Sequence, residues 1–234
     1  MTKIFKATHV GKVRKNNEDA LAVIEQKTFV VADGMGGAAG GEVASNLLVE
    51  TVKNFLPLVP EPWSEDILKK SVLKANAEIL QQSRQKPELQ GMGTTATILY
   101  LYNGQATFAH IGDSRLYRLR NLLFEQITED HSYVESLVRN GELTPEEAKV
   151  HPMKNILTQA VGAVDDIEVE TGSFTVAAGD IYLLCTDGLT NMVEDFDIGK
   201  ILLESENPAD DLIQAALDGG GHDNISVIVV KIEE

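Results

Sequence analysis

Short apolar runs recur along the chain with the length and spacing of β-strands. The runs lie at residues 21–24, 28–32, 95–102, 106–111, 116–119, 181–185 and 225–232, and polar or turn-forming residues separate them. Some of the connections between neighbouring runs, such as 103–105 and 112–115, are too short to hold a crossover helix. The pattern therefore predicts antiparallel pairing rather than a doubly wound parallel sheet.

Apolar residues at helical spacing predict helices between and after these strands. One apolar stripe runs along residues 43–55 and a second along 68–79, with Ser64 as the expected cap of the second. A later helix is predicted to start at Pro208 and to end at the glycines 219–221. Strands and helices together predict an α+β fold.

The segment 130–164 interrupts this alternation. It is polar and contains a turn-like sequence before Pro145. Long polar insertions of this kind are commonly lids or binding loops. We therefore predict a small helical flap inserted into one domain that spans residues 1–234.

Composition narrows the classes of partner. Acidic residues number 36 against 20 basic ones, which gives a formal net charge of −16. Such a charge opposes binding to nucleic acid and to an anionic membrane, so neither is expected as a partner. Cys185 is the single cysteine and lies in an apolar run, which predicts a buried structural thiol. No apolar stretch suits a spanning helix or a signal peptide, and we expect a cytoplasmic protein.

The main chemical signal is an aspartate beside Gly or Asn at the end of an apolar run. Asp33, Asp113 and Asp187 each follow such a run, and Asp223 with Asn224 immediately precedes one. Each carboxylate is therefore predicted at a strand terminus. A single Asp-Gly in this setting is more typical of a hairpin turn than of a ligand. Only the repetition of the pattern favours a shared site.

The glycine-rich segment 34–41 contains more glycine than a two-residue turn requires. This composition lets the backbone approach a ligand closely. A relaxed dinucleotide-binding fingerprint fits the segment formally, but Asp33 would point a negative charge at the pyrophosphate and no βαβ unit follows. A P-loop is excluded because no Lys-Ser or Lys-Thr ends the segment.

If the aspartates converge, their charges require a cationic partner, because adjacent carboxylates cannot all stay ionised alone. Oxygen ligands without clustered His or Cys favour magnesium or manganese over zinc. Two such ions bridged by a carboxylate are suited to hydrolysing phosphate esters. Asp33 is the best candidate for that bridge.

Seven short motifs carry a resemblance that runs nearly end to end. They are Gly11-x-x-Arg14-x-x-Asn17-Glu18-Asp19-Ala20, Asp33-Gly34-Met35-Gly36-Gly37, Gly93-Thr94-Thr95, Gly112-Asp113-Ser114-Arg115, Thr128-x-Asp130-His131-Ser132, Cys185-Thr186-Asp187-Gly188-Leu189 and Gly221-x-Asp223-Asn224. With these motifs in this order, the chain resembles the metal-dependent serine/threonine protein phosphatases of the type 2C class, especially their short bacterial members.

The resemblance implies a sandwich of two antiparallel sheets, flanked by helices on both outer faces, with metals in a cleft at one edge. It implies that Asp33, Asp187 and Asp223 hold a first Mn²⁺ or Mg²⁺ ion. Asp33 and the Gly34 carbonyl would hold the second ion. Asp113 would share a third, weaker ion with Asp187.

The same resemblance implies roles for residues near the first motif. Glu18 and Asp19 would act mainly on metal-bound water, and Arg14 would bind phosphate oxygens. Without the resemblance, Arg14 fits a basic surface patch with Lys12 and Lys15. The implied mechanism is in-line attack on phosphorus by a hydroxide that bridges two metals, without a phosphoenzyme.

One departure concerns the proton donor. Members of the family often have a histidine in or just after the glycine motif, whereas Met35 and Ala38 stand at these places here. The general acid is therefore unassigned, with metal-bound water as the alternative donor. His131 is expected to be a capping or packing residue.

Competing hypotheses concern activity and substrate. One is a weak or inactive relative that binds phosphorylated partners, and another is a phosphatase dedicated to one regulator, such as an anti-sigma-factor antagonist. We favour a monomeric phosphatase that acts on phosphorylated proteins, including a serine/threonine kinase.

Overall fold

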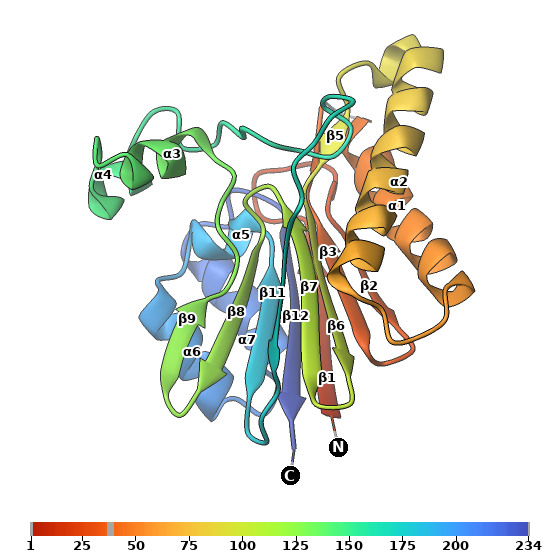
Figure 1. Cartoon of the computed structure of the whole chain (residues 1–234). Coiled ribbons are helices and arrows are strands. Elements are labelled where there is room, and N and C mark those ends of the chain that lie inside the picture. The colour runs from red at the N-terminus through yellow and green to blue at the C-terminus, as the bar shows by residue number, and fades with distance from the viewer. Residues whose placement is uncertain (1, 37–39, 234) are drawn as a thin grey trace.

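The computed structural model describes residues 2–36 and 40–233. Two five-stranded sheets, antiparallel throughout, pack face to face at its centre (Figure 1). In spatial order, the first contains β1 (Thr2–His9), β12 (Ile225–Ile232), β11 (Ile181–Cys185), β8 (Arg115–Arg120) and β9 (Leu123–Gln126). The second contains β10 (Glu170–Thr175), β7 (Gln105–Ile111), β6 (Ala96–Tyr102), β3 (Thr28–Ala32) and β2 (Ala20–Ile24). A small separate pair joins β4 (Gly34–Met35) to β5 (Gly93–Thr94).

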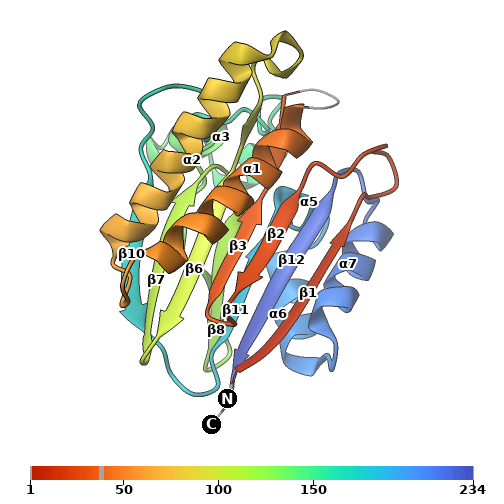
Figure 2. The same ribbon diagram turned by 90° about the vertical axis from the view of Figure 1, so that its right-hand side faces the viewer.

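Helices cover both outer faces of this sandwich (Figure 2). The second sheet packs against α1 (Gly40–Phe55) and α2 (Glu65–Gln85), which are followed by the 3₁₀ turns η1 (Leu56–Leu58) and η2 (Pro87–Leu89). The first sheet packs against α5 (Asp187–Thr190), α6 (Asp195–Glu204) and α7 (Pro208–Asp218). The predicted α-β-β-α sandwich is therefore confirmed.

The central strands are buried on both faces. In β12, Val227 and Val229 pack toward the helices, while Ile228 and Val230 pack between the sheets. Strands buried in this way carry continuous apolar runs instead of an alternating pattern. This burial explains why the strands at 181–185 and 225–232 were predicted within a residue of their observed ends.

Some strands and helices have no clear apolar pattern in the sequence and were not predicted. They are β1, β9, β10 and α6, together with the short elements around the site. Both β1 and β10 are edge strands with mostly half-buried or exposed side chains, so they lack a strong apolar run. The predicted cap Ser64 does occupy the N-cap position of α2, but its side chain forms no capping hydrogen bond.

The flap predicted at 130–164 contains α3 (Tyr133–Arg139) and α4 (Pro145–Lys149), which project beside the sandwich in Figure 1. Ser132 caps α3 by accepting a hydrogen bond from the Glu135 amide, and Thr144 forms a capping box with Glu147 on α4.

None of the helices among residues 2–36 and 40–233 has the length and apolar character needed to cross a bilayer. Cys185 is buried and free, as predicted.

Candidate metal centre

The strand arrangement brings the predicted aspartates to one edge of the sandwich. Asp33 follows β3, Asp113 follows β7, Asp187 follows β11 and Asp223 lies just before β12. Strands β11 and β12 run antiparallel in neighbouring positions, so the end of one lies beside the start of the other. All of these aspartates line a single open cavity of about 670 Å³.

The residues expected around them divide into lining and supporting groups. Arg14, Glu18 and Gly34 line the same cavity. Asp19 is absent from the lining, and its buried side chain accepts a hydrogen bond from Thr186 Oγ1 at 2.9 Å. Asp19 is therefore a buried neighbour of the site and not one of its lining residues.

Arg14 reaches across the cavity mouth to a predicted metal ligand. Its Nη2 atom donates to Asp223 Oδ2 at 2.7 Å, and the Arg14 side chain is 55% exposed. This hydrogen bond raises the pKa of Arg14, which keeps the guanidinium charged. The Arg14 side chain thus belongs to the site and is not only part of a basic surface patch.

Two threonines that carried no predicted role hold Asp33. The Asp33 amide donates to Thr95 Oγ1 at 2.8 Å, and Thr94 Oγ1 donates to the Asp33 carbonyl at 2.9 Å. Their only sequence signal was the Gly93-Thr94-Thr95 motif. Because both contacts use the backbone of Asp33, its carboxylate stays available to the cavity.

Asn224 is a second supporting residue that sequence reasoning left without a role. Its Oδ1 atom accepts from the Glu18 amide at 2.8 Å, and its Nδ2 atom donates to the carbonyls of Val10 and Asn16 at 2.9 Å each. Arg14 and Glu18 lie in one loop. The buried Asn224 side chain thus attaches this loop to the start of β12.

Close backbone contacts also shape the centre. A Cβ atom added to Gly188 would lie 1.9 Å from the Asn224 carbonyl oxygen, and one added to Gly34 would lie 2.2 Å from the Gly41 carbonyl oxygen. Only glycine allows such approaches. Gly188 therefore lets the segment that carries Asp187 pack directly against the segment that carries Asp223.

The carboxylates are in an environment that disfavours their charge. Burial, followed by the neighbouring carboxylates, raises the pKa of Asp33 and Asp113 well above the usual range. Burial also raises the pKa of Asp19 to about 7 and that of Asp187 to about 6. The ionised cluster therefore needs positive charge to be stable.

The donor atoms fit a hard divalent cation. Asp19 Oδ1 and Asp187 Oδ1 are buried and have no hydrogen-bond partner among the described residues. Buried polar atoms without partners are uncommon, and an ion can satisfy them. The ligands are all oxygen atoms, which suits Mg²⁺ or Mn²⁺.

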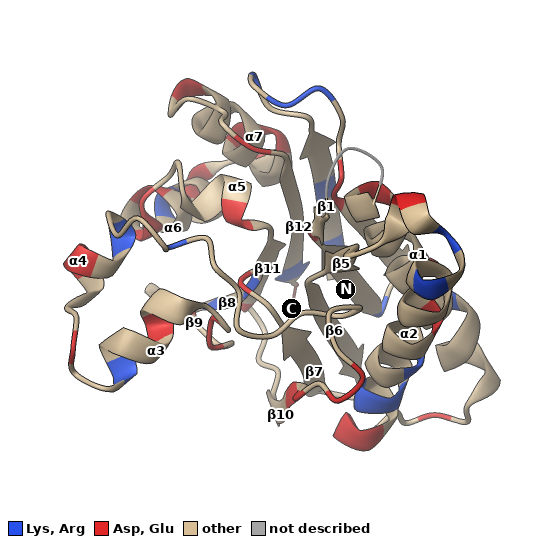
Figure 3. Cartoon of the chain, turned by 90° about the horizontal axis from the view of Figure 1, so that it is seen from above, with Lys and Arg blue, Asp and Glu red and all other residues tan. Residues whose placement is uncertain are grey.

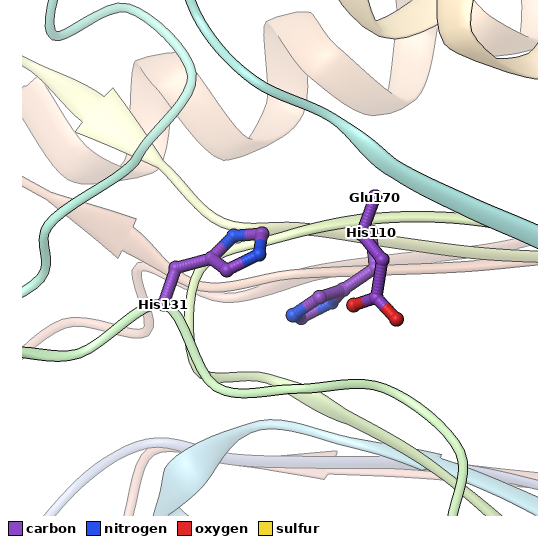
Figure 4. Close-up of side chains that lie close together, drawn as sticks. All are labelled: His110, His131 and Glu170. Carbon is purple, nitrogen blue, oxygen red and sulfur yellow. The ribbon is translucent and has the colours of Figure 1, made fainter. Parts of the chain in front are cut away.

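A different cluster, of His110, His131 and Glu170, has ligand atoms within 4.8 Å of one another (Figure 4). Both ring nitrogens of His110 are already hydrogen-bonded, Nδ1 with Thr97 Oγ1 at 2.9 Å and Nε2 with two backbone carbonyls at 3.1 Å each. A metal at His110 would have to displace these bonds. Burial lowers the pKa of His110 to about 3, so the ring is neutral.

The two histidines instead hold the backbone before Asp113. His110 Nε2 donates to the Gly112 carbonyl, and the His131 amide donates to the same oxygen at 2.7 Å. His131 Nδ1 accepts a hydrogen bond from the Gly112 amide at 3.2 Å. His131 is therefore a packing residue, as expected, and it supports the loop that carries Asp113.

The general acid is not a histidine of the described part of the cavity. Met35 lines the cavity, and no histidine does so among residues 2–36 and 40–233. Ala38, the other position at which the family often has a histidine, lies outside the described residues.

Comparison with known proteins identifies the family of this chain. A family model described as Protein phosphatase 2C matches residues 8–220. The chain belongs to the protein phosphatase 2C family. The predicted family and enzyme class, protein serine/threonine phosphatase, are thereby confirmed.

Curated phosphatases of this family are similar over nearly their full length. The chain is 40% identical to the serine/threonine phosphatase stp of Listeria monocytogenes, over 96% of this chain and 93% of the relative. It is 37% identical to the protein phosphatase PhpP of Streptococcus pneumoniae, over 97% of this chain and 96% of the relative.

Solved phosphatase structures share the fold. The serine/threonine phosphatase PstP/Ppp of Mycobacterium tuberculosis superposes with a TM-score of 0.94 at 37% identity, covering 100% of this chain and 99% of that chain. A PstP catalytic domain solved in complex with two manganese ions has a TM-score of 0.91 at 36% identity, covering 100% of this chain and 99% of that chain.

Proposed function

We propose that this phosphatase hydrolyses phosphoserine and phosphothreonine in proteins and opposes serine/threonine kinases, acting as a monomer with one catalytic domain. The observation that carries the proposal is the convergence of four half-buried aspartates beside Arg14 in an open cavity, with an unpartnered oxygen on Asp187. Family membership and the names of the relatives support the same activity.

The metal assignment is part of this proposal. Asp33, Asp187 and Asp223 would hold one Mn²⁺ or Mg²⁺ ion, and Asp33 with the Gly34 carbonyl would hold a second. Asp113 and Asp187 would hold a third, weaker ion, and both line the same part of the cavity wall. The two manganese ions in the PstP catalytic domain support the first two. When bound, such ions act as Lewis acids and activate water for in-line attack on phosphorus.

The residues of the chain would prepare the substrate for that attack. Arg14 can turn from Asp223 to the phosphate oxygens, where its planar group donates in a bidentate manner. Glu18 lines the cavity and would orient water. Asp19, whose Oδ2 atom accepts a hydrogen bond from Thr186, would act on metal-bound water through its unpartnered Oδ1 atom. Because no described lining residue is a histidine, we propose that water protonates the leaving alkoxide.

Purified protein with Mn²⁺ is expected to release phosphate from a phosphothreonine peptide, and excess chelator is expected to abolish the release. Mn²⁺ should also raise the melting temperature, because an ion that binds only the folded state stabilises it. Phosphate release and thermal melting measured on one preparation test both points. A folded sample without turnover in any divalent cation would overturn the proposal in favour of a phosphoprotein-binding relative.

Arg14→Ala is expected to lower kcat/KM by about 10- to 100-fold, because a hydrogen bond to a charged group contributes about 1.5–3 kcal/mol. Arg14→Lys should recover part of the lost kcat/KM, since lysine keeps the positive charge but lacks the planar guanidinium that donates two hydrogen bonds side by side. Inhibition by inorganic phosphate should weaken in parallel.

Lys12→Ala is the matched control, because Lys12 belongs to the same basic loop but does not line the cavity. It is expected to leave kcat/KM within about twofold of the wild-type value, as for a surface charge. Unchanged phosphate inhibition in Arg14→Ala would remove Arg14 from the phosphate-binding site.

A further inference from the structure

The catalytic cavity has a neighbouring cavity beside the flap. It shares Asp113, Asn155 and Asp187 with a second cavity of about 450 Å³, which lies between the flap and α5. The second cavity shares Val193 and Glu194 with a third of about 640 Å³. The three cavities are therefore neighbours, in a series from the aspartates to the space between α6 and α7, which we term the α6–α7 groove.

The α6–α7 groove has an acidic rim and an apolar floor. Its rim carries Glu194, Asp197, Glu204, Asp211 and Asp218. Its floor includes Met192, Ile201 and Ala215, which pack against the apolar core under the first sheet. Of the described residues that line the groove, Lys200 alone is basic. Figure 3 shows acidic residues on α6 and α7 at this side of the molecule.

Much of this negative charge is available to a ligand. The exposed carboxylates of Asp197 and Glu204 form no hydrogen bond or ion pair with any residue in the described ranges 2–36 and 40–233. The flap lysines do not neutralise them, because Lys149 pairs with Glu194 at 2.7 Å and Lys154 donates to Asn191 at 3.3 Å.

At the catalytic end of this series of cavities, cationic side chains lie beside the aspartates. Arg14 and Lys15 line the catalytic cavity, and Lys12 lies in the same loop. A ligand that matches both ends carries a phosphate at one end and cationic side chains at the other. Unpaired carboxylates over an apolar floor suit Lys and Arg, whose aliphatic stems pack on apolar surface while their charged ends meet the rim.

We propose that the α6–α7 groove binds a basic segment of the phosphoprotein substrate, so that this enzyme prefers phosphosites flanked on one side by Lys or Arg. This inference rests on the proposed phosphatase activity and names its substrate class.

The test compares phosphothreonine peptides that differ only in their flanks. Lys-Arg, Ala or Glu clusters are placed on either side of the phosphothreonine at increasing distances, and kcat/KM is measured with Mn²⁺. For one side we expect the basic peptides to exceed the Ala peptides by about tenfold, the sum of a few exposed charge pairs. Added salt should reduce this difference, since it screens exposed charges.

Asp197→Lys with Glu204→Lys should abolish or reverse the preference. Asp197 lies in the first turn of α6, where a lysine would oppose the helix dipole and could destabilise the fold. The milder pair Asp197→Asn with Glu204→Gln avoids this positive charge, and it should reduce the preference for basic peptides. Glu88→Lys with Asp166→Lys is the matched control for net charge. Both control residues are exposed and line none of the three cavities, and the preference should persist in that variant.

Two further readouts separate this inference from the proposed activity. Hydrolysis of p-nitrophenyl phosphate should be the same in all variants, because that substrate has no flank. Binding of a fluorescent, unphosphorylated Lys-Arg peptide should weaken at least fivefold in the Lys pair. Equal kcat/KM for basic, neutral and acidic peptides would overturn the groove assignment. If no substrate is hydrolysed at all, the phosphatase proposal fails, and the peptide-binding result alone decides the groove.

Discussion

Asp33→Asn is expected to reduce turnover by more than about 100-fold, because loss of a residue that merely supports a metal ligand already costs about 10- to 100-fold. The same change should stabilise the metal-free protein. Since burial and neighbouring carboxylates raise the pKa of Asp33 in the folded state, its ionised form opposes folding at neutral pH. Each 1 kcal/mol of relief corresponds to about 2–4 °C in melting temperature for a chain of this size.

Both effects are measured on one pair of proteins, by phosphate release with Mn²⁺ and by thermal melting with and without chelator. The variant should melt higher than the wild type without metal and gain less stability when Mn²⁺ is added. Asp166→Asn, at an exposed aspartate outside the cavity, should change neither quantity. Full activity in purified Asp33→Asn would contradict the proposed dinuclear centre.

Gly188→Ala is expected to destabilise the fold by about 3 kcal/mol, the upper range for forcing extra volume into packed structure. The added Cβ would lie 1.9 Å from the Asn224 carbonyl oxygen, and backbone must move to relieve this contact. The movement would separate Asp187 from Asp223, so activity should fall even in the fraction that stays folded. Chemical denaturation and kcat per folded molecule measure the two effects.

Gly199→Ala is the matched control, because Gly199 is also buried on the same side of the sandwich. A Cβ there would meet Phe124 at 3.6 Å, an ordinary contact, and alanine in a helix is favoured over glycine by about 0.5–1 kcal/mol. This variant should therefore be as stable as the wild type or more so. A Gly188→Ala protein with wild-type stability and activity would show that the close approach is dispensable.

The fold was predictable where burial leaves a local pattern. The strands at 181–185 and 225–232 could be predicted from the sequence because apolar side chains pack on both of their faces. The edge strands β1 and β10 were not, since each pairs along one side only and has many half-buried or exposed side chains. Their strand conformation depends on pairing with β12 and β7, which no local pattern records.

The site was predictable to a similar degree. Aspartates beside glycine or asparagine at the ends of apolar runs were visible one by one, and the family motifs indicated which of them to group. The roles of Thr95 and Asn224 were not visible, because these side chains act on backbone groups of distant residues. A threonine or asparagine in such a place has no distinctive neighbours in the sequence.

By itself, the sequence determined the apolar periodicity, the family resemblance and the carboxylates available for chemistry, because these are properties of residue types in local order. Only the tertiary structure decided what those residues meet. Arg14 and Asp223 lie 209 positions apart and form a hydrogen bond of 2.7 Å. Strand register, close glycine contacts and the packing of α6 against α7 create the cavity and the acidic groove, and such long-range packing leaves no periodic signal in the chain.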